Sequence, residues 1–152
     1  SRGPDCFWGY TEPARTAEAF VDGWYRTGDI GVQNEAGWLS ITDRVKDIII
    51  RGGENISAQE VEELLVRLPG VAECAVVAAP DERLGEHAAA FFRMHAGGAA
   101  PDLAAVRSAL GAAGLAKQKW PEEVHAVSEF PRTPSGKVQK FALRARLSGQ
   151  CR

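Results

Sequence analysis

Cysteine is scarce in this chain, and long apolar runs are absent. The three cysteines, Cys6, Cys74 and Cys151, are far apart and form no C-x-x-C motif. We therefore expect free thiols in the reducing cytoplasm rather than a disulfide framework. No run approaches the roughly twenty apolar residues of a transmembrane helix, and no signal peptide is visible. We expect no transmembrane segment.

Patterns typical of metal and nucleic-acid binding are also missing. The histidines, His87, His95 and His125, lack metal-ligand spacing and have no paired acid or cysteine, which predicts ordinary structural histidines and no metal site. The formal net charge of −2 argues against a dedicated nucleic-acid-binding protein. Charge is uneven, however, because no acidic residue follows Glu129, whereas basic residues continue: Arg132, Lys137, Lys140, Arg144, Arg146 and Arg152. This end is either a solvated basic tail or a segment that contacts a polyanion such as a nucleotide.

The composition that is present is that of a globular protein, with 45% hydrophobic and 25% charged residues. The 152 residues suffice for one ordinary domain or about one and a half small ones. The chain starts at Ser1 without a methionine, so we interpret it as a fragment of a longer protein.

The first 42 residues are rich in turns. A short helix is predicted over 13–21, and strands are predicted at 24–25 and 38–41, joined as a hairpin around 34–37. Asp29 lies in the tight connection between these strands. An aspartate after a glycine is a common turn, but a fixed carboxylate also suits a pair of sugar hydroxyls.

The next elements are marked by clear periodic patterns. The β-branched run at 45–50 predicts a strand buried on both faces. A helix is predicted over 57–68, because Ser57 and Glu60 have the spacing of a capping box. Its apolar face consists of Val61, Leu64, Leu65 and Leu68.

Strands and helices then alternate to the end of the chain. The predicted elements are strands at 71–79 and 87–94 with a turn at Pro80-Asp81, a helix over 101–110, a strand at 124–127 and a helix over 140–147. Helices interleaved with a small mixed sheet predict an α+β fold, with an open α/β module as the other option. The natural domain boundary lies within 43–47.

Three polar features can take part in chemistry, and each also has a structural explanation. Arg44 presents planar donors suited to phosphate or carboxylate, but with Lys46 and Asp47 it also forms an ordinary solvated turn. Gly52-Gly53 lets the main chain turn sharply or approach a ligand, although a lone Gly-Gly is more often only a turn. Lys137 follows a Pro/Gly turn, where it is either a surface lysine or a mobile cation for phosphate and carboxylate oxygens.

Five motifs occur in the order of a known family. They are Gly23-Trp24-Tyr25-Arg26-Thr27-Gly28-Asp29; Asp43-Arg44-Val45-Lys46-Asp47; Gly52-Gly53-Glu54-Asn55-Ile56 with Glu60-Val61-Glu62; Pro80-Asp81 with Leu84-Gly85-Glu86; and Pro131-Arg132-Thr133-Pro134-Ser135-Gly136-Lys137. Through them the sequence resembles, over nearly its whole length, the C-terminal part of an adenylate-forming acyl-CoA synthetase, a fatty-acid or related carboxylate–CoA ligase.

The resemblance implies a two-step reaction. ATP and a carboxylic acid give an acyl-adenylate and pyrophosphate, and the CoA thiol then displaces AMP to form a thioester. The implied cofactors are ATP, CoA and Mg²⁺, the metal being bound mainly by a large N-terminal domain. Residues 1–43 would be the β-rich end of that domain. Residues 44–152 would be the small C-terminal domain, which closes over the large one and rotates between the two half-reactions.

The resemblance also implies roles for single residues. Asp29 matches the aspartate that accepts hydrogen bonds from the ribose hydroxyls, and Arg44 matches the arginine that contacts the nucleotide near the ribose and phosphate. Lys46 matches the hinge position. Lys137 matches the lysine that bridges carboxylate and α-phosphate oxygens during adenylation. The loop that enters the site for thioester formation and lies along the pantetheine arm of CoA corresponds to Gly52, Gly53 and Glu54.

The sequence departs from the family pattern at two residues and lacks one loop of the family. Asp43 and Ala58 stand where the family often has glycine and proline, and neither carries chemistry. The phosphate loop of the N-terminal domain is missing, so this piece alone is not expected to turn over. Two alternatives stay open: an adenylation domain that loads a carrier protein, and a non-catalytic binding module that keeps the fold. The acyl group is not predicted, because its pocket would lie in the N-terminal domain.

Overall fold

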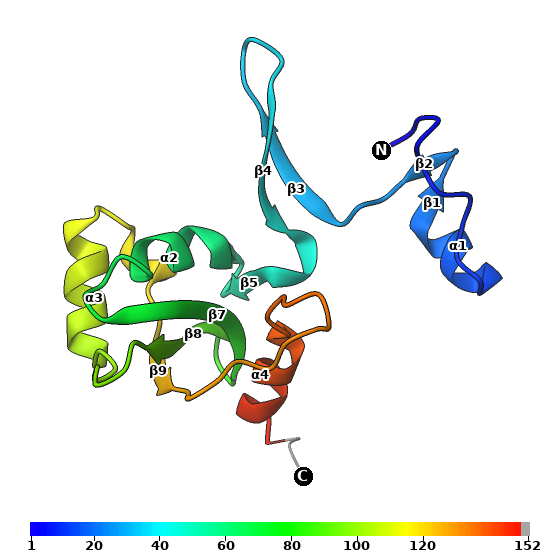
Figure 1. Cartoon of the computed structure of the whole chain (residues 1–152). Coiled ribbons are helices and arrows are strands. Elements are labelled where there is room, and N and C mark those ends of the chain that lie inside the picture. The colour runs from blue at the N-terminus through cyan, green and yellow to red at the C-terminus, as the bar shows by residue number, and fades with distance from the viewer. Residues whose placement is uncertain (150–152) are drawn as a thin grey trace. The chain divides into compact units, whose positions relative to one another are not determined.

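A computed structural model describes residues 1–149 (Figure 1), so Cys151 and Arg152 lie outside the described residues. The chain divides into two compact units, Ser1–Lys46 and a second unit that begins at Asp47. Within residues 1–149, no helix combines the length and the apolar character needed to span a membrane. Cys6 and Cys74 are free thiols, as predicted.

The first unit contains one helix and two small antiparallel sheets. Its elements are α1 (Pro13–Ala19), β1 (Phe20–Val21), β2 (Trp24–Tyr25), β3 (Asp29–Gln33) and β4 (Leu39–Arg44). The predicted helix over 13–21 therefore ends two residues early, because Phe20 and Val21 pair with Tyr25 and Trp24.

The predicted pairing of 24–25 with 38–41 is wrong, because a different strand, β3, pairs with β4. β4 pairs with β3, whereas β2 pairs with β1. The reason lies in the turns. Asp22 and Gly23 have φ values of 50° and 76°, as a two-residue type I′ hairpin turn requires, so β2 closes back on the strand just before it.

The second unit is built on one mixed sheet with the strand order β6-β5-β8-β7 and β9 paired to β8. Its strands are β5 (Ile48–Arg51), β6 (Glu54–Ser57), β7 (Val71–Asp81), β8 (Gly85–Met94) and β9 (Glu123–Ala126). The β8–β9 pairing is parallel and the other pairings are antiparallel. The predicted α+β fold with a small mixed sheet is confirmed.

Helices cover both faces of this sheet (Figure 1). α2 (Ala58–Leu65) and α3 (Leu103–Ala112) pack on one face, where Val76 and Phe92 join the larger apolar core. α4 (Lys140–Leu147) packs on the other face through the fully buried Leu143. Alternate residues of β7 and β8 supply the two cores, because successive side chains of a strand point to opposite faces.

Two predictions around β5 need correction. The run 45–50 begins with a 3₁₀ turn over Val45–Asp47, so the strand starts only at Ile48. It is not buried on both faces, because Ile49 is fully buried whereas Ile50 is 55% exposed. The second core is built on β7 and β8 and does not extend to β5.

The predicted capping box forms at the start of α2, where the Ser57 hydroxyl accepts a hydrogen bond from the Glu60 amide at 3.1 Å. The helix ends at Leu65 rather than at 68, and β6, which precedes it, was not predicted. The predicted turn at Pro80-Asp81 is wrong, because β7 continues through Asp81 and the turn follows at 82–84.

The later elements lie close to their predicted positions. α3 begins two residues later than the predicted 101, because the Asp102 carboxylate caps the Ala105 amide. β9 is shifted by one residue from 124–127, and α4 has its predicted bounds.

Ser57→Ala should lower the free energy of unfolding by about 1 kcal/mol, because it removes the acceptor at the α2 N-cap. Urea denaturation measures this change. Ser108→Ala, on the exposed side of α3, serves as the control and should change stability by less than about 0.5 kcal/mol. Equal effects of the two substitutions would contradict the capping role.

Candidate functional site

In the first unit, the predicted ribose-binding aspartate and nucleotide-contacting arginine lie side by side. Asp29 and Arg44 are cross-strand partners in the β3–β4 ladder. The Arg44 Nε donates to Asp29 Oδ1 at 3.0 Å, with the two side chains 50% and 31% exposed. Arg44 Nη2 also donates to the Thr27 carbonyl at 3.4 Å. The second carboxylate oxygen of Asp29 and the remaining donors of Arg44 stay accessible to a polar ligand.

A shallow hollow adjoins this pair. It has a volume of about 230 Å³ and is lined by Thr27, Gly28, Arg44, Val45 and Lys46. The Thr27 hydroxyl accepts a hydrogen bond from the Asp29 amide at 3.1 Å, which fixes the turn that carries the carboxylate. This corner of the first unit therefore combines an anchored carboxylate, a guanidinium and an open concave surface.

Lys46, the predicted hinge, is the last residue of the first unit, and Asp47 is the first residue of the second. Both belong to the 3₁₀ turn over Val45–Asp47. Lys46 is exposed, whereas Asp47 is held within the second unit by Arg144, whose Nη1 donates to Asp47 Oδ1 at 3.3 Å.

In the second unit, Gly52 and Gly53 form the turn between β5 and β6. Their φ values of 57° and 91° lie in the left-handed region, which favours glycine. The Gly52 amide donates to the Leu84 carbonyl at 2.8 Å. An ideal Cβ on Gly53 would meet no atom within 4 Å, so one side of this loop is open.

Lys137 lies at the end of a tightly hydrogen-bonded loop between Arg132 and Val138, which pair as an isolated bridge. The Thr133 hydroxyl accepts from the Lys137 amide at 3.1 Å, and the Thr133 amide donates to the Lys137 carbonyl at 2.9 Å. The Lys137 side chain is exposed, and among residues 1–149 no carboxylate pairs with it, whereas Lys140 pairs with Glu62 at 2.7 Å.

A charged cluster attaches the Lys137 loop to the sheet. Arg132 donates from Nη1 to the Gly136 carbonyl at 2.8 Å and from Nη2 to the Glu73 carboxylate. Glu73, on β7, also accepts from Arg93 of β8 at 2.5 Å. Partial burial raises the pKa of Glu73, but hydrogen bonds from Arg93 and Arg132 outweigh this effect and hold the net pKa below its ordinary value.

We call the turn of Gly52 and Gly53 the glycine loop and residues 132–138 the Lys137 loop. These two loops are attached near opposite ends of the β7–β8 hairpin. Glu73 pairs with Arg93 near one end, and Asp81 pairs with Gly85 at the other. Asp81 lies eight positions after Glu73 on the same strand, which corresponds to a distance of roughly 27 Å along β7. Two distinct surfaces of the second unit therefore carry the two sets of candidate residues.

Several contacts were not predicted from the sequence. The Glu73–Arg132 pair joins residues far apart in the chain, with no local pattern to reveal it. The expectation that the histidines have no paired acid is wrong for two of them, because His87 and His125 both contact Glu123, at 2.6 and 2.8 Å. The Glu123-x-His125 spacing places two of these groups on one strand face, which is the signal that could have indicated their contact.

Comparison with known proteins assigns the chain to a family. Residues 60–137 match the AMP-binding enzyme C-terminal domain, and the chain belongs to this family. It is 47% identical over 146 residues to a medium-chain fatty-acid–CoA ligase of Escherichia coli (strain K12), covering 95% of the chain and 26% of that enzyme.

The chain is also similar to a second ligase in sequence and to a solved structure in fold. The chain is 43% identical over 143 residues to the fatty acid–[acyl-carrier-protein] ligase ScoC of Streptomyces coeruleorubidus, covering 94% of the chain and 27% of that protein. The structure of ATP-bound MatB from Rhodopseudomonas palustris matches with a TM-score of 0.86 and 37% identity, covering 95% of this chain and 29% of that one. The chain thus spans about a quarter of the length of these relatives.

Glu73→Gln should lower the free energy of unfolding by about 1–2 kcal/mol at pH 7, because it weakens two charge-assisted hydrogen bonds. Since the folded-state pKa is lowered, the wild-type advantage is complete above the ordinary glutamate pKa of about 4.3. It is lost as the pH falls through the lowered folded value. Urea denaturation at a series of pH values tests this, with the exposed Glu82→Gln as the control. An undiminished difference well below pH 4 would contradict the assignment.

Proposed function

We propose that this chain is the C-terminal part of a carboxylate–CoA ligase that activates a carboxylic acid with ATP and transfers the acyl group to CoA. The observation that carries the proposal is Lys137. It is an exposed cation on a rigid loop, without an acidic partner among residues 1–149, while Arg132 and Lys140 nearby are paired. A lysine held this way is available to a reacting anion.

In the proposed first step, a carboxylate oxygen of the acid attacks the α-phosphorus of ATP, and pyrophosphate leaves. Lys137 lies between the carboxylate and an α-phosphate oxygen and stabilises the negative charge that increases there. Asp29 accepts hydrogen bonds from the ribose hydroxyls, and Arg44 contacts the nucleotide near its ribose and phosphate. The Asp29–Arg44 geometry supports this, because their accessible groups face solvent beside the hollow.

In the proposed second step, the CoA sulfur attacks the acyl carbonyl carbon, and AMP leaves with the bonding electrons. The loop of Gly52, Gly53 and Glu54 lies along the pantetheine arm. Its positive φ values and its open side support a close approach of the main chain to a slender ligand. Lys46 is the hinge about which the small domain, 44–152, turns relative to the N-terminal domain, of which 1–43 is the end.

Mg²⁺ would accompany ATP. Among the described residues, no group of three histidine, cysteine or acidic side chains is arranged to hold a metal ion. We therefore propose that the ATP phosphates and the N-terminal domain hold the ion. We propose a cytoplasmic location from the free thiols.

Acyl transfer to a carrier protein is the second candidate for the final step. The specific observation in its favour is the 43% identity to the ScoC ligase, which is named for an acyl-carrier protein. Both acceptors present a thiol on a pantetheine arm, so the glycine loop suits either. The higher identity to the Escherichia coli CoA ligase favours CoA. A non-catalytic module that keeps the fold is less well supported, because it would not need an unpaired Lys137.

Lys137→Ala in the full-length protein should lower carboxylate-dependent ATP–pyrophosphate exchange by about 100-fold, because the charge that stabilises adenylation is lost. Octanoate, palmitate, salicylate and sulfoacetate are suitable acids to test. Arg146→Ala, which removes an exposed cation of α4, is the matched control and should change exchange by less than twofold. No exchange by folded wild-type protein with any acid would favour the non-catalytic module.

Lys46→Pro should slow one half-reaction far more than the other, because proline fixes φ at the proposed hinge. The two rates are measured separately, by pyrophosphate exchange and by thioester formation from supplied acyl-adenylate. Lys46→Ala, which keeps the backbone free, is the control. Unchanged rates for both steps in the proline variant would remove Lys46 from the mechanism.

A further inference from the structure

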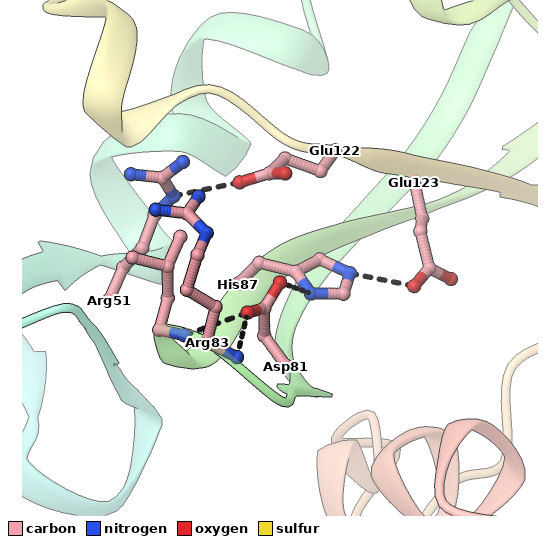
Figure 2. Close-up of polar contacts among 7 residues, drawn as sticks. Arg51, Asp81, Arg83, His87, Glu122 and Glu123 are labelled. Atoms are coloured by element: carbon pink, nitrogen blue, oxygen red, sulfur yellow. Dashed lines mark hydrogen bonds and ion pairs between the residues drawn. The ribbon is translucent and has the colours of Figure 1, made fainter.

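A cluster of charged and polar groups in the second unit is centred on the buried ring of His87. His87, at the start of β8, is only 8% exposed. Its Nε2 lies 2.6 Å from Glu123 Oε1, and its Nδ1 lies 3.5 Å from Asp81 Oδ2 (Figure 2). The other oxygen of Glu123 contacts His125 Nε2 at 2.8 Å. Of these groups only the His87 ring is buried, and its Nδ1, which faces Asp81, makes no hydrogen bond within residues 1–149. Burial of a polar ring is costly unless its contacts hold a particular geometry.

Asp81 connects this cluster to the β7–β8 turn. While Oδ2 faces His87, Oδ1 accepts hydrogen bonds from the main-chain amides of Arg83 at 2.9 Å and Leu84 at 2.7 Å. Figure 2 shows the carboxylate between the imidazole and the turn. The amides of Leu84 and Arg83 lower the pKa of Asp81, so the carboxylate remains an acceptor at neutral pH. One side chain thus fixes the turn on one side and contacts a buried ring on the other.

The β7–β8 turn at 82–84 also contacts the glycine loop. The Leu84 carbonyl accepts the Gly52 amide hydrogen at 2.8 Å, and a Cβ on Gly52 would lie 3.0 Å from the Leu84 side chain. Two more contacts flank this point: Glu86 accepts from the Ile50 amide at 2.8 Å, and Arg51 donates to Glu122 at 2.7 Å. Just before the loop, the main chain is therefore held by the start of β8, and the Arg51 side chain is held by the residue before β9.

The loop needs such an anchor because of its composition. Two successive glycines have the largest conformational freedom of any residue pair, so they do not fix their own geometry. The Gly53 side is open, so the inner contact to Leu84 limits how far the loop can move. A displacement of about 1 Å at a site where atoms must be positioned for reaction can cost about 100-fold in rate.

We propose that Asp81 and His87 are positioning residues for the acyl-transfer step: through the Leu84 turn they hold the Gly52-Gly53 loop in the conformation that guides the thiol arm of the acceptor. This inference rests on the proposed function. Neither residue touches the reacting atoms. The Lys137 loop is attached near the opposite end of the hairpin, so the adenylation step does not depend on this cluster.

The test compares Asp81→Ala with wild type in the full-length enzyme, in both half-reactions. Removing the acceptor for two turn amides should lower the rate of thioester formation from supplied acyl-adenylate by about tenfold, or raise the KM for CoA similarly. ATP–pyrophosphate exchange should stay within twofold. Asp81→Asn, which keeps an oxygen for the turn amides, should restore most of the thioester rate. Glu73→Gln, near the other end of the hairpin, should not reproduce the pattern.

Amide hydrogen exchange provides a readout that does not depend on activity. Asp81→Ala and His87→Gln should increase exchange at Gly52 by about tenfold, while Lys137, whose amide is held by Thr133, should be unaffected. Increased Gly52 exchange with an unchanged thioester rate would overturn the positioning role but leave the proposed function intact. Wild-type protein that forms no thioester from acyl-adenylate would overturn the proposed function itself, and the positioning role with it. An equal loss in both half-reactions would reduce the cluster to a general stabilising role and contradict the proposal.

Discussion

The antiparallel ladder between β7 and β8 is the constraint on which the second unit depends. It runs from the Val71–Met94 pair to the Asp81–Gly85 pair, and its alternating side chains supply both apolar cores. The same ladder provides the attachment points for two loops, near its two ends. Under the proposed function, this ladder lets one small domain present different side chains in the two successive reaction steps while its core keeps the same packing.

The charged side chains of the second unit fall into two groups, those that fix a loop and those that stay accessible to a ligand. At each end of the ladder a carboxylate of β7 receives hydrogen bonds that fix a loop, from Arg132 to Glu73 and from turn amides to Asp81. The groups proposed to meet substrates are left accessible. Lys137 has no acidic partner among residues 1–149, and the Gly53 side of the glycine loop is open. In the second unit, the groups that hold the two loops are thus paired, whereas Lys137 and the open side of Gly53 are left accessible.

Local patterns predicted the local structure well and the long-range contacts poorly. The bounds of α4 and the Ser57 cap were predicted because periodicity and capping depend on residues a few positions apart. β6 was missed because it becomes a strand only through pairing with β5. The Glu73–Arg132 and Asp81–His87 contacts depend on strand register and chain folding. The site assignments, from Asp29 to Lys137, came from the resemblance and stay predictions.

Under the proposed function, Lys137 serves adenylation and not acyl transfer. The most direct test is single-turnover transfer from supplied acyl-adenylate to CoA by the full-length Lys137→Ala variant. We expect thioester formation within about twofold of the wild-type rate, because this step uses the glycine loop at the other end of the hairpin. A loss of transfer as large as the loss of adenylation would contradict it, and would mean that Lys137 supports the fold or both reactions alike.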